Sequence, residues 1–190
     1  MESPCGCASH PNRRTMSLRI QQVSTPNLPA ALRDAILALC EAAYEEPMAG
    51  YLADIGSGEH LLGFEAERLV SHLMWVERRL EVAAGPALRT AYIELVATHP
   101  TAQGRGHATA LLAELPPRIA AYDLGALSPA TEGLYFRAGW EYWRGPLFHR
   151  RNGQFVPDSE ERVMVLRLPR SPALDLDAAL SVDWRPGEVW

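Results

Sequence analysis

The sequence predicts an α+β fold with a single mixed, mostly antiparallel central sheet flanked by helices. Three observations predict it: an amphipathic helical segment comes early, three consecutive segments with strand composition follow, and helices then alternate with short apolar strands. The chain has 190 residues, of which 47% are hydrophobic, and this suits one domain with its own core. We expect a flexible tail over residues 1–15 and one domain over residues 16–190.

The first half of the domain predicts a strand, a helix and a meander. Residues 17–25 alternate in polarity as a strand does, and residues 29–44 place apolar side chains at helical spacing. Residues 45–60 are acidic and glycine-rich, which predicts a loop with room for a helical turn. Runs rich in Val, Leu, Tyr and Trp then predict antiparallel strands over residues 61–66, 68–82 and 88–98.

The second half alternates helices and strands. A helix begins near Gly106 and runs to residue 115, and Pro116-Pro117 should break or kink it because proline lacks an N–H group and clashes with the preceding turn. Residues 171–190 predict a polar helix and a tail. Between them we expect strands over residues 122–128, 141–145 and 162–168 and a short helix over residues 131–139, which ends at a glycine.

Charge, hydropathy and cysteine content exclude several classes of protein. A net charge of −5 argues against a broad nucleic-acid-binding face and is compatible with a small cationic substrate. No apolar run approaches the roughly 18 residues of a membrane span, and the N-terminus lacks the apolar core of a secretory signal, so we expect a cytoplasmic protein. Cys5 and Cys7 near His10 lack a fourth metal ligand, and we expect no metal site.

A glycine-containing loop joins the last meander strand to the following helix. The strand ends at Val96-Ala-Thr98, and the loop reads Gln103-Gly-Arg-Gly-His-Ala108. The first turn of a helix has free N–H groups and a partial positive charge, and glycines remove Cβ atoms that would hold a large anion away. The loop therefore predicts a site for a phosphate or diphosphate, with an ordinary glycine turn as the alternative. It is neither a P-loop nor a Rossmann fingerprint, because the third glycine of the latter is replaced by Thr109.

Gln103, Gly106 and Ala108 match the pattern [RQ]-x-x-G-x-[GA], and the loop resembles the acetyl-coenzyme A loop of the GCN5-related N-acetyltransferase superfamily. Three further stretches are similar to the aminoglycoside 2'-N-acetyltransferases: "AYIELVAT", "YDLGALSPATEGLYFRAGW" and the C-terminal "DWRPGEVW". The resemblance runs from about residue 17 to residue 190 and is weakest across residues 45–60. It implies the fold predicted above, acetyl-coenzyme A as cosubstrate, and an antibiotic-resistance enzyme. Members of the superfamily often dimerise, which leaves a homodimer open.

The resemblance implies residues for the cosubstrate. The backbone of Val96 and Thr98 should pair with the pantetheine arm as an added strand does. Arg105 is expected to contact the diphosphate, and the alternative is that its side chain is only solvated. We expect His107 to be a residue of the helix start and not a catalytic residue. The residues expected to surround the diphosphate are Gln103, Gly104, Arg105, Gly106, His107 and Ala108.

For catalysis the resemblance implies direct transfer in a ternary complex. Glu94 is expected as the general base, acting through ordered water, and Tyr135 as the general acid that protonates the leaving thiolate. Ser128 matches a serine that lies near the thiol. The alternative for Glu94 is a glutamate on a solvated face of the strand, since alternation puts Ile93 and Leu95 together on the opposite face. The alternative for Tyr135 is an aromatic residue of the core.

An aminoglycoside is a polycation, so its site should contain carboxylates. Leu95 stands where better-known members have glycine, and the segment between Ser128 and Tyr135 is two residues shorter than the family pattern. These departures predict an altered acceptor, and kasugamycin is our candidate. Two alternative functions remain open. One is a general acetyltransferase that acts on a peptide, polyamine or metabolite amine, and the other is a non-catalytic acyl-coenzyme A sensor. The residues expected to bind the acceptor are Glu45, Glu46, Glu160, Glu161, Glu188 and the terminal Trp190, the last two most strongly.

Overall fold

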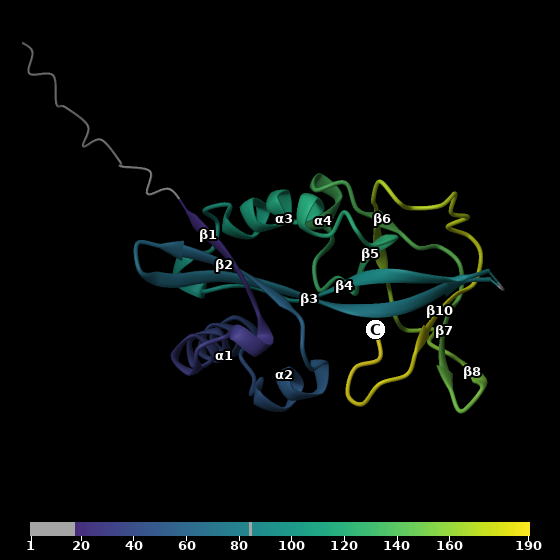
Figure 1. Cartoon of the computed structure of the whole chain (residues 1–190), viewed down its shortest axis with the longest axis horizontal. Coiled ribbons are helices and arrows are strands. Elements are labelled where there is room, and N and C mark those ends of the chain that lie inside the picture. Colours follow the sequence, from purple (N-terminus) through teal and green to yellow (C-terminus); the bar gives the residue numbers. More distant parts are fainter. Residues whose placement is uncertain (1–17, 84) are drawn as a thin grey trace, which may run out of the picture.

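The computed structural model describes residues 18–83 and 85–190. Within these ranges one mixed sheet runs through the molecule, with helices on both of its faces (Figure 1). Helices α1 (Ala30–Tyr44) and α2 (Ala49–Ile55) cover one face, and α3 (His107–Arg118) and α4 (Glu132–Arg137) lie on the other. The predicted fold class is confirmed. The expected tail over residues 1–15, with its two cysteines, lies outside the described residues.

The long antiparallel strands β3 (Arg68–Val82) and β4 (Ala87–Thr98) form the centre of the sheet. On one side, β2 (Glu59–Glu65) pairs with the first half of β3, and β10 (Leu180–Asp183) pairs with its end. On the other side, β5 (Leu124–Leu127) pairs with β4 in parallel. The outer strands are β1 (Arg19–Ser24), β6 (Glu141–Tyr142), β7 (Leu147–Arg151), β8 (Gln154–Pro157) and β9 (Met164–Arg167).

Each face of the sheet has its own hydrophobic cluster. Helix α1 buries Ile36 and Leu39 against the face shared with α2. Helix α3 buries Leu111, Leu112 and Leu115 against the opposite face. Burial of each such side chain stabilises the fold by about 1.5–3 kcal/mol, and it fixes the position of the loop that precedes α3.

The expected break at Pro116-Pro117 is wrong. Helix α3 includes both prolines and ends at Arg118, and the N–H of Ile119 still bonds to the carbonyl of Leu115 at 3.2 Å. Leu115 and Ile119 have no exposed surface. Their packing against the sheet stabilises a last turn that local propensity disfavours.

The region after residue 145 differs most from expectation. The predicted polar helix within residues 171–190 is wrong, because this segment instead forms β10, which is hydrogen-bonded to β3 on one edge and β7 on the other. The hairpin β7–β8 was not predicted. Its turn residues Asn152 and Gly153 have φ of 53° and 76°, and Asn-Gly is the sequence that favours such a turn.

Strand β4 contains a β-bulge directly after Glu94. Met74 pairs with Glu94 and His72 pairs with Ala97, so two residues of β4 lie opposite one residue of β3. Leu95 is in the left-handed region with φ of 51°. For a leucine this conformation costs roughly 1–2 kcal/mol, so the surrounding contacts must hold it.

The bulge also changes which side chains share a face. Leu95 packs in the cluster under α1 and α2, together with Tyr92 and Ala97, whereas Ile93 packs in the cluster under α3. The expectation that Ile93 and Leu95 share a face is therefore wrong. An extra residue in one strand shifts the alternation of every position that follows it.

A buried pair of histidines lies beside the bulge. His60 of β2 and His72 of β3 are 2% and 0% exposed, and His60 Nδ1 is 3.0 Å from His72 Nε2. Burial lowers the pKa of both side chains, that of His72 to about 3. Both imidazoles are therefore neutral at pH 7.

We expect the folded chain to lose stability as pH falls from about 6.5 towards 3, because the unfolded chain binds protons at His60 and His72 that the folded chain excludes. Each histidine contributes a slope of up to about 1.4 kcal/mol per pH unit in this window. Urea unfolding between pH 7 and pH 4 should show a shallower loss for His72→Asn than for wild type. His99→Asn, a change in a partly exposed loop histidine, is the control, and identical slopes for wild type and His72→Asn would contradict the expectation.

Candidate active site

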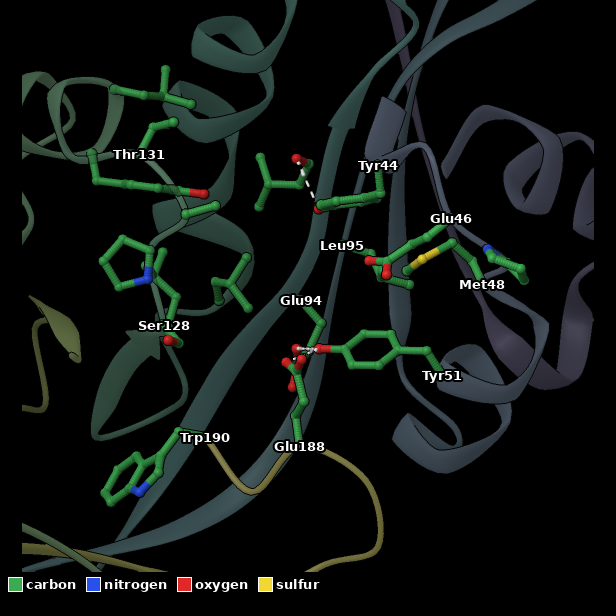
Figure 2. A pocket seen from close by; sticks show the side chains of 18 residues that line it. Tyr44, Glu46, Met48, Tyr51, Glu94, Leu95, Ser128, Thr131, Glu188 and Trp190 are labelled. Carbon is green, nitrogen blue, oxygen red and sulfur yellow. Dashed lines mark hydrogen bonds between the residues drawn. The ribbon is translucent and has the colours of Figure 1, made fainter. Parts of the chain in front are cut away.

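A cavity of about 520 Å³ opens beside β4 and brings together residues from distant segments (Figure 2). Glu94 reaches it from β4, Ser128 from the residue after β5, and Tyr135 from α4. The three residues expected to be catalytic thus line one cavity. The connection between α1 and α2 and the C-terminal segment form the remaining walls.

The cavity exists because β4 and β5 separate. Their parallel pairing covers Thr90–Tyr92 of β4 and Leu124–Ala126 of β5, but β4 continues to Thr98. Residues 93–96 and 127–131 then line opposite sides of the cavity. Beyond Tyr92 the backbone of β4 has no partner strand on this edge, so an extended ligand can pair with it as a strand would.

The two residues expected to meet the pantetheine arm lie on this free part of β4. Tyr44 of α1 donates its hydroxyl hydrogen to the carbonyl of Val96 at 3.2 Å, and the amide of Gln103 donates to the carbonyl of Thr98 at 3.2 Å. Each carbonyl oxygen retains a second lone pair. These contacts hold the edge in place while leaving it able to bind a ligand.

The loop before α3 has the features of an anion site. Gly106 precedes the helix with φ of 83°, no side chain caps it, and the first helical bond is from the N–H of Ala110 to the carbonyl of Gly106 at 2.9 Å. The N–H groups of residues 107–109 therefore have no helical acceptor. A Cβ built on Gly104 or Gly106 meets no atom within 4 Å, so the approach is open. The loop fits the diphosphate expected there.

Two side chains of this loop are engaged elsewhere. Arg105 Nη1 lies 3.2 Å from Glu65 Oε2, and its Nη2 donates to the carbonyl of Thr101 at 2.9 Å. His107 is buried and its Nε2 lies 3.0 Å from Glu65 Oε1, but in an orientation that makes no hydrogen bond. The backbone of the loop is thus better placed than these two side chains to hold a diphosphate.

Glu94 is a buried carboxylate with two donors. It is 6% exposed, its Oε1 accepts from Arg185 Nη2 at 2.5 Å, and its Oε2 lies 3.2 Å from the hydroxyl of Tyr51. Burial raises the pKa of Glu94, and the charge and hydrogen bond of Arg185 and the hydroxyl of Tyr51 partly oppose that rise. A carboxylate with a raised pKa binds a proton more readily, as a general base must.

Tyr51 joins Glu94 to the C-terminal segment. Its hydroxyl lies 3.2 Å from Oε2 of Glu94 and 3.2 Å from Oε2 of Glu188 (Figure 2). A phenol has one hydrogen and can donate to one of these carboxylates at a time. Burial and the two carboxylates raise the pKa of Tyr51, so the hydroxyl stays protonated.

The C-terminal segment is held in place by three side chains. Arg78 donates to the main-chain carbonyls of Asp183 and Val189, and Arg185 donates to Glu94. The indole N–H of Trp190 donates to Asp158 Oδ2 at 2.6 Å. These bonds bring Glu188 and Trp190 to the cavity wall, as the sequence led us to expect.

The other acidic residues expected at the acceptor site divide into two groups. Glu46 lines the cavity, and Glu161 lies at its margin, where its Oε2 is 3.5 Å from Ser128 Oγ. Burial and the nearby charges of Glu188 and Asp158 raise the pKa of Glu161. Glu45 and Glu160 are exposed and do not line the cavity, because Glu45 ends α1 and Glu160 lies in the connection before β9.

Tyr135 is both a core aromatic and a residue of the cavity wall. It is 6% exposed and packs edge-on against Trp140 at a centroid distance of 6.2 Å, and it also lines the cavity. Burial raises the pKa of Tyr135 to about 12. The phenol therefore keeps its proton until a strong base forms beside it.

Three residues of the site were missed from the sequence: Tyr44, Tyr51 and Arg185. Tyr44 is the last residue of α1, next to the stretch expected to be a loop. Tyr51 lies within that stretch, where helix α2 positions it. Arg185 was present in the quoted "DWRPGEVW", but nothing local showed that its partner is Glu94. In the described ranges, no helix is long and apolar enough to cross a bilayer, and no cluster of His, Cys, Asp and Glu side chains has the form of a metal site.

The sequence profile of the acetyltransferase (GNAT) domain matches residues 30–143, which include β4, the glycine loop and α4. The chain belongs to the GNAT acetyltransferase family. This GNAT chain is 36% identical over 129 residues to an aminoglycoside 2'-N-acetyltransferase from Mycolicibacterium fortuitum. That match covers 64% of this chain and 66% of the relative. The family expected from the glycine loop is confirmed.

Solved GNAT structures share the fold at low identity. A GNAT family acetyltransferase from Brucella melitensis, solved in complex with acetyl-CoA, is 16% identical with a TM-score of 0.57, over 84% of this chain and 94% of that one. Eis1 from Mycobacterium abscessus is 20% identical with a TM-score of 0.56, over 68% of this chain. The match spans only 32% of the Eis1 chain.

Replacement of Arg185 should raise the pKa of Glu94. Arg185→Gln removes the larger of the two positive charges that oppose the desolvation of Glu94 and leaves that of Arg78, so the carboxyl should titrate at higher pH than in wild type. Carbon-13 NMR titration of the Glu94 carboxyl measures this directly. Arg144→Gln, which removes an exposed partner of Asp177, is the control. An unchanged or lower pKa of Glu94 in Arg185→Gln would contradict this account of the site.

A side chain at Gly106 should weaken coenzyme A binding, because its Cβ enters the open approach to the free N–H groups of α3. We expect Gly106→Ala to bind acetyl-coenzyme A about tenfold more weakly than wild type, by calorimetry. Gly153→Ala is the matched control, since Gly153 also has positive φ and open surroundings but lies in the β7–β8 turn. Wild-type affinity in a folded Gly106→Ala would show that the diphosphate binds elsewhere.

Proposed function

We propose that the chain transfers the acetyl group of acetyl-coenzyme A to an amine of an aminoglycoside, with the 2'-amino group as the expected position. One observation carries the proposal. The buried carboxylate of Glu94 stands between the gap at the end of β5 and the acidic C-terminal segment. A base, a place for a thioester and a place for a cationic acceptor thus meet in one cavity.

The free edge of β4 and the start of α3 are the residues that would hold the cosubstrate. The backbone of residues 96–98 offers strand-like pairing, and the N–H groups of residues 107–109 offer an anion cradle. Acetyl-coenzyme A supplies the acetyl group as a thioester. Both contacts are made by the main chain, so they bind the carrier without selecting the acceptor.

Glu94 takes the first proton from the acceptor ammonium, directly or through one water, and the freed amine can then form its C–N bond as the C–S bond breaks. Tyr135 gives its proton to the departing sulfur and regains one from the nitrogen. The ammonium thus loses two protons in all: Glu94 holds the first, and the second replaces the proton that Tyr135 gave to the thiol. The pKa of Tyr135, about 12, keeps the phenol protonated at neutral pH. Its proton moves to the sulfur as the proton from nitrogen replaces it, so no free phenolate forms. Ser128 lines the same cavity, and we assign its hydroxyl a hydrogen bond to the sulfur.

The charges of the cavity favour a polycationic acceptor. Glu46, Glu94 and Glu188 line it, and the pKa of Glu161 at its margin is raised by the charges of Glu188 and Asp158. Carboxylates that disfavour each other's charge are stabilised when an ammonium group enters between them. The name of the M. fortuitum relative supports an aminoglycoside. It names no particular drug, so kasugamycin remains one acceptor to test beside deoxystreptamine aminoglycosides.

The decisive experiment is an acceptor screen with two variants. Release of free thiol from acetyl-coenzyme A should be fastest with an aminoglycoside, and mass spectrometry should show one added acetyl group. We expect Glu94→Gln to lower kcat by about 10²–10⁴-fold, the range of general base catalysis, and Tyr135→Phe by about 10²-fold. Phe155→Tyr, a change on the exposed hairpin, should leave kcat unchanged.

Three outcomes would contradict the proposal. Full activity in Glu94→Gln and Tyr135→Phe would remove both residues from their roles. Turnover of peptides or polyamines in preference to every aminoglycoside would assign the cavity to another amine, and saturable coenzyme binding without turnover of any acceptor would favour a sensor.

A further inference from the structure

A chain of hydrogen bonds runs through the core to the bulge in β4, and the reaction described above does not use it. It begins where the N–H of Gly58 donates to Thr25 Oγ1 at 2.9 Å. Thr25 Oγ1 is 3.0 Å from His60 Nε2, and His60 Nδ1 is 3.0 Å from His72 Nε2. His72 Nδ1 is 3.0 Å from the carbonyl oxygen of Leu95.

The carbonyl at the end of this chain fixes the direction of the bonds that the two histidines make with each other and with Leu95. Leu95 O can only accept, so His72 Nδ1 carries the hydrogen, and in the neutral ring His72 Nε2 is an acceptor. His60 Nδ1 must then be the donor, which leaves His60 Nε2 as an acceptor that faces the hydroxyl of Thr25. The single hydrogen of that hydroxyl has two acceptors at 3.0 Å, His60 Nε2 and the carbonyl of Gly58. Both imidazoles are therefore expected as Nδ1–H tautomers. Any other assignment places two donors or two lone pairs face to face.

The end point of the chain is the strained residue of the site. Leu95 adopts φ of 51°, which glycine tolerates and leucine disfavours, and its side chain lines the cavity. The bulge takes Leu95 out of the regular pairing with β3, and the side chain of His72 reaches across from β3 to its carbonyl. Glu94 precedes this residue and Val96 follows it, so its conformation sets how the two are oriented relative to each other.

We propose that His72 is a positioning residue for acetyl transfer. Held in one tautomer by Thr25 and His60, its Nδ1–H group keeps the Leu95 carbonyl in place and so maintains the bulge. The bulge in turn sets how Glu94 in the cavity and Val96 at the free edge of β4 are oriented relative to each other. This inference rests on the proposed function for its effect on rate, and on the bond network alone for its effect on structure.

The surroundings keep the pair neutral. The groups that face it are the thiol of Cys40 in α1, whose Sγ is 3.9 Å from His72 Nδ1, the carboxylate of Glu59 and the guanidinium of Arg33. Burial and the charge of Arg33 lower the pKa of His60, and together they outweigh the charge of Glu59, which raises it. Protonation of His72 would place a second N–H group against the N–H of His60 and break the chain at that point.

The first test uses nitrogen-15 NMR of the imidazole rings and needs no substrate. At pH 7 both His60 and His72 should be neutral with the hydrogen on Nδ1. In Thr25→Val the ring of His60 loses the donor to its Nε2 and should show a mixture of tautomers, whereas Thr25→Ser should keep the wild-type pattern. An Nε2–H tautomer or a protonated ring at His72 in the wild-type protein at pH 7 would overturn the proposal.

The second test separates positioning from packing. His72→Leu removes the donor, His72→Asn restores an N–H donor at the position of Nδ1, and Cys40→Ala removes volume beside His72 without touching Leu95. We expect His72→Leu to lower kcat by about 10²-fold with acetyl-coenzyme A affinity changed less, as displacement of a catalytic group does. His72→Asn should recover most of that loss, and Cys40→Ala should leave kcat within about threefold of wild type.

The outcomes distinguish this inference from the proposed function. Equal losses of kcat in His72→Leu and Cys40→Ala, or no recovery in His72→Asn, would show that His72 acts through packing alone. If no acceptor is turned over, the proposed function fails, and the positioning is then judged by the backbone amide shifts of residues 94–96. These should move in His72→Leu and not in Cys40→Ala. If they stay in place in His72→Leu, the inference fails as well.

Discussion

The site depends on one constraint, the separation of β4 from β5 after Tyr92. A strand in the middle of a sheet normally satisfies its N–H and C=O groups on both edges, and here one edge is left free over the last residues of β4. The free edge is usable because the rest of β4 is well fixed. It pairs with β3 along most of its length, and buried side chains pack on both of its faces. The bulge directly after Glu94 shifts the alternation of the residues that follow, which include Val96.

A second consequence of the same arrangement is a buried charge. Glu94 is removed from water at the base of the cavity, and a carboxylate there is stable only with partners. Arg185 and Tyr51 supply them, one from the C-terminal segment and one from α2. The C-terminal segment is itself held by Arg78, so Glu94 and the acidic wall around it are parts of one connected network. The environment of this carboxylate therefore depends on the folding of the last residues.

Several elements could be predicted from local pattern. The period of apolar residues predicted α1, the meander and α3, and the glycines before α3 predicted an open approach to the start of that helix, because these features depend on residues close in sequence. The Asn-Gly turn of the β7–β8 hairpin carried an equally local signal, but it was overlooked. The errors at Pro116-Pro117 and in residues 171–190 have another cause. There, packing against the sheet and pairing with β3 and β7 outweigh local preference.

The sequence by itself determined the fold class, the family, and the residue types at Glu94, Ser128 and Tyr135, since each follows from a pattern within a short stretch. Only the tertiary structure decided which charges meet. Arg185 is 91 residues from Glu94 along the chain, and Thr25, His60 and Leu95 are joined by bonds that cross three strands. No spacing rule encodes such contacts, because they arise from how the strands are placed side by side. The bulge was also decided by the tertiary structure, since the alternation of apolar residues in the sequence of β4 gives no sign of the extra residue.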